Sequence, residues 1–281
     1  MKTGFYAFPL GDCECVSLWD GVFVYKPESF FANAPQEQVD SALLARGVPA
    51  DRIETPYSQL FVRTKEHRIL VDMGAGVLAP TTGNLLNSMR HAGIQLESID
   101  SIFITHAHPD HIGGMLNNEG KPVFPQATYY LARAEWEFWF SDQAASQAGE
   151  WMTHFAQQAL TPIKDKIVLL ERNGEILPGV SVLFTPGHTP GHMVVSFTSD
   201  KEQLLYTGDV VIHPLHLEHP DWLPIFDILP EEADSSKRCI FDLAASSGSW
   251  VLGQHFSPFP SLGHIYKRDN GWEWEPISLE E

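Results

Sequence analysis

Residues 105–114 read Thr-His-Ala-His-Pro-Asp-His-Ile-Gly-Gly and carry four side chains of metal-binding type within six positions. They follow an apolar Ser-Ile-Phe-Ile run, which is typical of a buried strand. Side chains two apart on a strand face the same way, so His106 and His108 can converge on one ion. A turn after them can direct Asp110 and His111 towards a second ion. The spacing therefore predicts two neighbouring metal sites. The two glycines that close the stretch are expected to let the backbone turn sharply beneath the metals and start a helix.

Three further segments supply candidate ligands. An apolar strand ends in Phe-Thr-Pro-Gly-His-Thr-Pro-Gly-His at 184–192, where two Pro-Gly pairs predict a rigid loop that carries His188. His192 in the same loop is expected to hold the loop rather than bind metal. Another strand delivers Asp209 into a turn, and a carboxylate can bridge two cations, whereas an imidazole cannot. His255 follows an apolar Val-Leu pair. Each of these residues alone is more typical of a cap or a core position, but together with the first stretch they predict a metal centre. Their nitrogen and oxygen donors favour zinc and also suit Mn, Fe or Co.

The alternation of short apolar strands with amphipathic helices predicts a layered α/β fold. The expected strands lie at 15–19, 60–64, 68–72, 101–105, 128–132, 167–170, 180–185, 194–198 and 203–207. Helical patterns lie at 36–46, 83–92, 133–140 and 233–245. No low-complexity segment or long Gly/Ser linker marks a boundary, so a single domain is expected over residues 1–281.

Charge and composition narrow the choice of partners. The chain has 18 Lys+Arg against 36 Asp+Glu, and its net charge of −18 disfavours nucleic acids and anionic membrane surfaces. No apolar stretch of about 18 residues is present, and Pro9 interrupts the N-terminal segment before a signal sequence develops. Three cysteines make no disulfide framework. These features predict a cytoplasmic protein that acts on a small molecule. The 13 histidines favour metal chemistry.

The order of the motifs resembles the metallo-β-lactamase superfamily of hydrolases over roughly residues 60–264. The resemblance implies a four-layer αββα sandwich with a dinuclear site at one edge of the paired sheets. Asp72 matches the family's early Asp-x-Gly turn, whose aspartate supports the ligand loops. The resemblance also implies seven ligands in two groups joined by a bridging carboxylate: His106, His108 and His188 for one metal, Asp110, His111 and His255 for the other, and Asp209 between them.

The stretch from His255 to His264 resembles the branch that contains methyl parathion hydrolase and the quorum-quenching lactonases. In that branch the first histidine is the ligand, which leaves His264 a structural residue. The resemblance implies a hydrolase in which a hydroxide between two metals cleaves small esters or lactones, with organophosphates as a further class. Asp110 would orient the hydroxide and carry the proton. A thioesterase like glyoxalase II is the alternative because it shares the histidine motifs, although no C-terminal basic cluster suits a glutathione carboxylate.

Several residues near the motifs are candidates for contact with substrate or with a second copy. Tyr206 either assists the substrate carbonyl, as a tyrosine does in the lactonases, or packs in the core. The segment 212–222 carries three more histidines and could form part of the pocket wall. Apolar candidates for that pocket are Trp222, Leu223 and Phe226. For a homodimer, the N-terminal region offers an aromatic surface made of Phe5, Tyr6, Phe8, Phe30 and Phe31.

Overall fold

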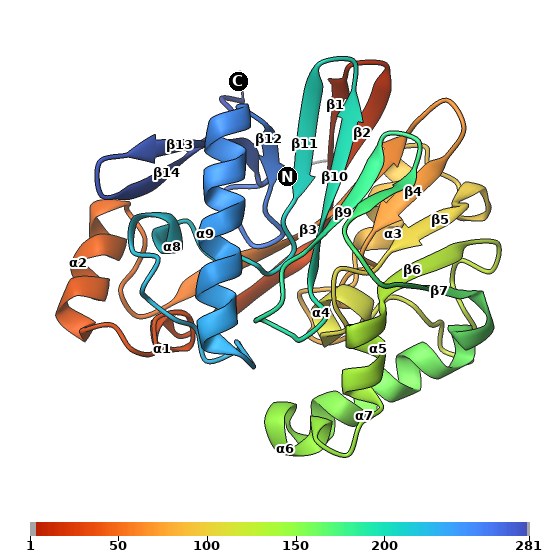
Figure 1. The fold of residues 1–281 in the computed structure, drawn as a ribbon, viewed down its shortest axis with the longest axis horizontal. Helices are drawn as coiled ribbons and strands as arrows, with labels where there is room; N and C mark the ends of the chain where they lie inside the picture. Colours follow the sequence, from red (N-terminus) through yellow and green to blue (C-terminus); the bar gives the residue numbers. More distant parts are fainter. Residues whose placement is uncertain (1–3, 280–281) are drawn as a thin grey trace.

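Two β-sheets of seven strands each form the centre of the structure, a computed structural model that describes residues 4–279 (Figure 1). The first sheet follows the chain order from β1 to β7. Neighbours from β1 to β4 pair antiparallel, and neighbours from β4 to β7 pair parallel. Its strands are β1 (Phe5–Leu10), β2 (Cys13–Tyr25), β3 (Ile53–Arg63), β4 (Arg68–Val71), β5 (Ser101–Phe103), β6 (Thr128–Ala132) and β7 (Ile167–Leu170).

The second sheet has the order β14 to β8, again sequential along the chain. Its neighbours pair antiparallel except for β11 and β12, which are parallel and are joined by a long connection that contains α9. Its strands are β8 (Gly174–Leu177), β9 (Val180–Phe184), β10 (Met193–Ser199), β11 (Glu202–Tyr206), β12 (Trp250–Leu252), β13 (Leu262–Arg268) and β14 (Gly271–Pro276).

Helices cover the outer faces of both sheets, so the predicted αββα order of layers is confirmed. One apolar cluster joins the first sheet to α3, α5 and α7, a second lies between the sheets, and a third lies under α9. Among residues 4–279, no helix has the length and apolar character needed to cross a membrane. The helices are α1 (Pro27–Phe30), α2 (Gln36–Ala45), α3 (Leu85–His91), α4 (Pro109–Ile112), α5 (Arg133–Trp139), α6 (Ala144–Ala148), α7 (Glu150–Leu160), α8 (Leu215–Glu218) and α9 (Pro230–Ser247), with 3₁₀ turns at η1 (Leu96–Ser98) and η2 (Thr161–Lys166).

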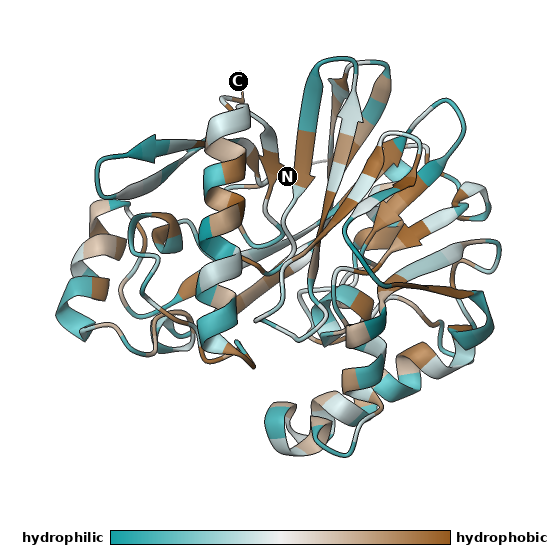
Figure 2. Cartoon of the chain, in the orientation of Figure 1, coloured by the Kyte–Doolittle hydropathy of each residue, from teal (hydrophilic) through white to brown (hydrophobic). Residues whose placement is uncertain are grey.

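The predicted strands and helices are present, β6 and β7 with the predicted bounds and the others with shifted ends. The pattern at 83–92 is α3 and the pattern at 233–245 is α9, while the strand expected at 15–19 is the middle of the longer β2. The elements that the sequence pattern did not predict include β1, β8, β12, β13, β14, α6 and α7. Figure 2 shows why the hairpin of β13 and β14 was not predicted: it is largely hydrophilic at its tip and offers no apolar run.

The prediction of an aromatic outer surface near the N-terminus is wrong for Phe30 and Phe31. Each is only 2% exposed, and both belong to an apolar cluster that also contains Leu43 and Trp222. The ring centroids of Phe31 and Trp222 lie 5.4 Å apart. These aromatic side chains therefore anchor the α1 and α2 segment to the loop before α9.

The loops that carry the predicted ligands meet at one edge of the molecule. They follow the carboxyl ends of β5 in the first sheet and of β9, β11 and β12 in the second. Main-chain hydrogen bonds join the two sheets at this edge: Met193 N–H donates to the Thr105 carbonyl at 3.0 Å, and Ser58 N–H donates to the Gln254 carbonyl at 3.0 Å. The topology thus places segments far apart in the sequence around one point.

Candidate metal centre

The loop after β5 holds its three histidines inside the protein. His106, His108 and His111 are 0%, 6% and 0% exposed. The chain stays extended through His108 and then forms α4, which begins at Pro109, because the fixed φ of proline suits the first helical turn. The change from extended chain to helix separates the first two histidines from the third, as the spacing predicted.

The glycine pair at 113–114 has a different role from the predicted one. It follows α4 and does not start it. A Cβ on Gly113 would lie 2.3 Å from the carbonyl oxygen of Ala75, and a Cβ on Gly114 would lie 2.1 Å from that of Met73. The pair therefore lets this segment lie directly against the backbone that follows β4.

The second sheet brings the remaining candidates to the same place. His188, Asp209 and His255 are 3%, 6% and 5% exposed and follow β9, β11 and β12. All seven residues predicted from the sequence lie together. Their ligand-type atoms form two groups, within each of which the atoms lie no more than 4.8 Å apart: His106, His108 and His188 in one, and Asp110, His111, Asp209 and His255 in the other.

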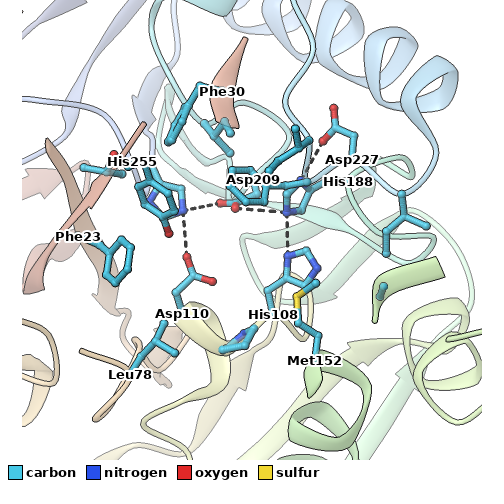
Figure 3. A pocket seen from close by; sticks show the side chains of 18 of the residues that line it. Phe23, Phe30, Leu78, His108, Asp110, Met152, His188, Asp209, Asp227 and His255 are labelled. Atoms are coloured by element: carbon cyan, nitrogen blue, oxygen red, sulfur yellow. Dashed lines mark hydrogen bonds and ion pairs between the residues drawn. The ribbon is translucent and has the colours of Figure 1, made fainter. Parts of the chain in front are cut away.

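Asp209 lies between the two groups, as Figure 3 shows. Its Oδ1 is 3.2 Å from Nε2 of His111 and 3.1 Å from Nε2 of His255. Its Oδ2 is 3.4 Å from Nε2 of His188 in the other group. One carboxylate therefore turns one oxygen to each group, which is the geometry that a bridging ligand requires.

The donor atoms of the site fit divalent cations. Within the part of the chain that the structure describes, Nε2 of His106 and Nε2 of His108 are buried without a hydrogen-bond partner, although buried polar atoms are usually satisfied. Nδ1 of His108 and Nε2 of His188 face each other at 2.9 Å. Three converging ring nitrogens match the ligand number of an open zinc site, and the mixed carboxylate and imidazole group beside them suits a second cation.

Charge distinguishes the two groups. Burial lowers the pKa of His106 and brings the pKa of His108 to about 3, so both rings are neutral near neutral pH and their lone pairs are free. Burial would also lower the pKa of His255, but neighbouring carboxylates, Asp209 first, outweigh it and raise that pKa to about 9. Burial would raise the pKa of Asp209, but the adjacent histidines hold it well below its ordinary value. A cation that enters this second group must displace protons.

Asp72 supports the centre from behind, as the resemblance implied. Its carboxylate accepts hydrogen bonds from the backbone N–H and the hydroxyl of Thr105 at 2.8 and 2.7 Å, and it lies 2.7 Å from Nδ1 of His111. Asp72 adopts a left-handed φ of 59°, a strained conformation for an aspartate that is found preferentially at functional sites. In this conformation the side chain of Asp72 fixes both the Thr105 loop and the ring of His111.

Glu135 on α5 supports the centre too, and the sequence did not point to it. This carboxylate is completely buried and accepts four hydrogen bonds, which come from Ala107 N–H at 2.8 Å, Trp139 Nε1–H at 2.7 Å, Thr189 hydroxyl at 2.6 Å and Gly191 N–H at 3.0 Å. It thus ties the loop of His106 and His108 to the loop of His188. The sequence signal that could have pointed to Glu135 is its position: it is an acidic residue one helical turn before Trp139 on an otherwise apolar helix face.

A comparison with known families agrees with this geometry. Residues 52–255 match the family model of the metallo-beta-lactamase superfamily. The chain belongs to the metallo-β-lactamase superfamily. With its two His/Asp groups and the relatives described next, this superfamily member is a metal-dependent, lactonase-like hydrolase.

Two solved structures resemble this superfamily member over its whole length. AidC, a dizinc quorum-quenching lactonase in complex with the product N-hexanoyl-L-homoserine, has a TM-score of 0.92 at 30% identity, and the match covers 99% of both chains. The hydrolase AbOPH has a TM-score of 0.92 at 28% identity over 100% of both chains. An N-acyl homoserine lactonase from Bacillus cereus is 25% identical over 198 residues, which are 63% of this chain and 72% of that protein.

A cavity of about 560 Å³ opens above the metal centre of this metallo-β-lactamase-fold hydrolase. His108, Asp110, His188, Asp209 and His255 lie along it and form its polar floor (Figure 3). Its walls are mainly apolar and include Phe23, Phe30, Leu78, Trp151, Met152, Ile212, Ile225, Phe226 and Ile228. The prediction for Phe226 is thus confirmed, whereas Trp222 is a core residue, 4% exposed, and neither Trp222 nor Leu223 lies among the lining residues.

Three other predicted residues lie outside the reacting groups. His192 holds the loops, because its Nδ1 lies 2.7 Å from the Thr185 hydroxyl and its Nε2 accepts the Asp209 N–H at 2.9 Å. Tyr206 is completely buried and donates to Gln254 Oε1 at 2.6 Å, which makes it a core residue. His264 on β13 lies 3.0 Å from the Ser249 carbonyl through its Nδ1 and belongs to neither ligand group.

Proposed function

We propose that this hydrolase opens the ring of N-acyl lactones, N-acyl homoserine lactones first among them, in one domain that spans residues 1–281. The observation that carries the proposal is a cavity of about 560 Å³ with a floor of metal-ligand side chains and apolar walls. A lactone ring suits the floor and an acyl chain suits the walls. The similarity to AidC, a lactonase whose structure contains the bound product, supports the same substrate class.

We assign the seven ligands as the superfamily resemblance implies: His106, His108 and His188 to one cation, Asp110, His111 and His255 to the other, and Asp209 to both. The two-sided contacts of Asp209 support its bridging role. Zinc is the proposed metal because the donors are imidazoles and carboxylates and AidC is a dizinc enzyme, while Mn, Fe and Co suit the same donors.

Two bound cations would lower the pKa of water and polarise the lactone carbonyl. The protein then has to position the ring and handle one proton. We assign that proton to Asp110: its Oδ2 lies 3.4 Å from Nε2 of His255, and its Oδ1 is the oxygen that would hold the proton of the attacking water. The water oxygen bonds to the carbonyl carbon, the bond from that carbon to the ring oxygen breaks, and the ring oxygen takes the proton from Asp110.

The test is to compare kcat/KM of the zinc-loaded protein for N-acyl homoserine lactones, aryl esters, S-acyl glutathione thioesters and phosphotriesters. We expect the highest value for the lactones, a loss of activity on chelation and its return with zinc. A higher value for the thioesters would replace this proposal with the thioesterase alternative. A higher value for the phosphotriesters would assign the floor to phosphoryl substrates instead. Action on a small molecule in the cytoplasm, without nucleic acid or membrane, and assembly as a homodimer stay predictions.

A further inference from the structure

Asp227 is a buried carboxylate to which the reaction described above gives no role. It lies in the connection between α8 and α9, its side chain is 6% exposed, and it lines the cavity. Figure 3 shows it pointing at His188, on the side of the ring away from the other ligands. Its Oδ1 is 2.9 Å from Nδ1 of His188.

We propose that Asp227 is a positioning residue that aims His188 at the metal centre and couples this ligand to the cavity wall. A carboxylate accepts the hydrogen bond here, so Nδ1 of His188 is the ring nitrogen engaged by Asp227 and Nε2 is the one directed at the metal centre. That Nε2 faces Nδ1 of His108 at 2.9 Å and Oδ2 of Asp209 at 3.4 Å. The inference rests on the proposed function, because it takes His188 as a ligand.

The role assigned to Asp227 is also supported by a matching contact in the other ligand group. In one group, Asp72 lies 2.7 Å from Nδ1 of His111. In the other group, Asp227 lies 2.9 Å from Nδ1 of His188. Each group therefore has one histidine whose remote ring nitrogen meets a buried carboxylate. Such a partner fixes the tautomer and the ring orientation, and its loss usually weakens metal binding by about 10- to 100-fold.

The backbone fastens the His188 loop to the same segment. Ile228 N–H donates to the carbonyl of His188 at 3.1 Å, and Leu229 N–H donates to the carbonyl of Gly187 at 2.8 Å. Gly187 has a φ of 141°, and a Cβ there would lie 2.2 Å from the Cα of Ala233. Only glycine allows the loop to lie this close to the start of α9. The ring of His188 is thus held through its side chain and its main chain by residues 227–229.

The neighbours of Asp227 belong to the wall that would hold an acyl chain. Ile225, Phe226 and Ile228 all line the cavity. The Phe226 ring packs against Tyr25 and Phe30 with centroid distances of 5.8 and 6.1 Å. A substrate that fills the cavity therefore contacts the segment that orients His188. Loss of the Asp227 contact should lower kcat more than it raises KM, because the wall itself remains.

The experiment compares Asp227→Ala and Asp227→Asn with the wild type in the full chain. Asp221→Asn is the matched control, since Asp221 is an exposed acidic residue in the same connection. The readouts are zinc per chain, zinc affinity from competition with a chromophoric chelator, the visible spectrum of the Co²⁺-loaded protein, kcat and KM, and the Tm of the zinc-free protein. Zinc and cobalt binding report on the ligand ring independently of substrate.

We expect Asp227→Ala to bind one of its two zinc ions about 10- to 100-fold more weakly and to have an altered cobalt spectrum. Asp227→Asn keeps an acceptor for Nδ1–H and should fall between Asp227→Ala and the wild type, while Asp221→Asn should match the wild type. Unchanged zinc affinity and cobalt spectrum in both Asp227 variants would overturn the inference. If Asp227→Ala does not fold, Asp227→Asn decides, and failure of both to fold would assign Asp227 to folding and also overturn it. A wild-type protein that binds no zinc would instead overturn the proposed function.

Discussion

Asp110 has two proposed roles, as a ligand and as the carrier of a proton, and asparagine at this position keeps the shape while removing the second role. We expect Asp110→Asn to lower kcat by about 10²- to 10⁴-fold, the range that a positioned acid–base group contributes. The fold should be unchanged because the side chain is on the cavity floor and not in an apolar cluster. Kinetics on variant protein of measured zinc content check this prediction, and unchanged turnover at full zinc content would contradict it.

His255 and His264 form a matched pair for testing the ligand assignment. His255 lies 3.1 Å from Oδ1 of Asp209, whereas His264 contacts the Ser249 carbonyl and the Trp250 ring. We expect His255→Ala to retain one tightly bound zinc and His264→Ala to retain two. Metal analysis after dialysis against a weak chelator gives the answer. The assignment fails if the two variants hold equal zinc.

His213 predicts how stability depends on pH. Burial lowers its pKa to about 3, against an ordinary value of 6.5. Between these values the unfolded chain binds a proton that the folded chain does not, so the free energy of unfolding falls as the pH drops below about 6.5. His213→Asn removes the titration and leaves an oxygen that can accept the Leu215 N–H.

The loss of stability between about pH 7 and pH 5 should therefore be smaller for His213→Asn than for the wild type, by up to about 1.4 kcal/mol per pH unit. Urea denaturation of the zinc-free proteins measures both curves, and removing zinc keeps the titration of metal binding out of the comparison. Parallel curves would show that His213 is not the residue responsible.

The four ligand candidates within residues 106–111 could be predicted from the sequence because their spacing follows from local geometry, whereas the full set of seven was implied by the resemblance to the superfamily. His106 and His108 alternate on extended chain, and Pro109 starts the helix that turns the next two residues away. Asp227 and Glu135 carry no such signal. Their roles depend on which loops the fold brings beside them, and sequence spacing does not contain that information.

The short helix α5 is joined to the loops of the centre by hydrogen bonds of one residue, Glu135. Glu135 places Oε1 against Ala107 N–H and Trp139 Nε1–H, and Oε2 against Thr189 and Gly191. Glu135→Gln would turn an amide NH₂ towards these donors. We expect the free energy of unfolding to fall by about 2–3 kcal/mol, because a buried donor loses its acceptor.

Glu137 on the same helix is the control for this change. Its side chain is 65% exposed, and it forms a 4.0 Å ion pair with Arg133. Glu137→Gln should alter the free energy of unfolding by less than about 0.5 kcal/mol. Denaturant unfolding of both variants gives the comparison, and equal effects would mean that the four contacts of Glu135 do not stabilise the fold.

Strands and helices could be predicted where their residues form a continuous apolar face, and they were missed where the element is only partly buried. Five buried aliphatic and aromatic positions allowed β4 and β5 to be predicted. The strand β14, with the sequence Gly-Trp-Glu-Trp-Glu-Pro, buries only Trp272 fully and reads as a polar tail. Pairing with β13 fixes it, and this is a tertiary effect.

For the molecule as a whole, metal should contribute strongly to stability. The ligands come from both sheets, so zinc binds the folded chain and has little affinity for the separated loops. Zinc at 100 times its dissociation constant would add about 2.7 kcal/mol per site to the free energy of unfolding. We expect chelation to lower the Tm and zinc to restore it in calorimetric scans. A Tm that does not depend on zinc would argue against occupied sites.

The cavity walls could not be predicted as a set. Phe23 and Leu78 come from the first half of the chain, Met152 from α7, and Ile225 from the connection before α9. No local pattern relates these positions, and each reads as an ordinary apolar residue. Only the packing of both sheets with the intervening helices makes them neighbours.

The ligands of the metal centre come from both halves of the chain. Four ligands lie after β5 and three belong to the second sheet, while Cys13, Cys15 and Cys239 are free thiols. No disulfide joins the two halves of the chain. A pair of zinc ions would do this instead, as a cross-link that a chelator opens without any redox chemistry. A chain cleaved between β7 and β8 would then recover both ions only when its fragments associate, so zinc retention would report their reassembly.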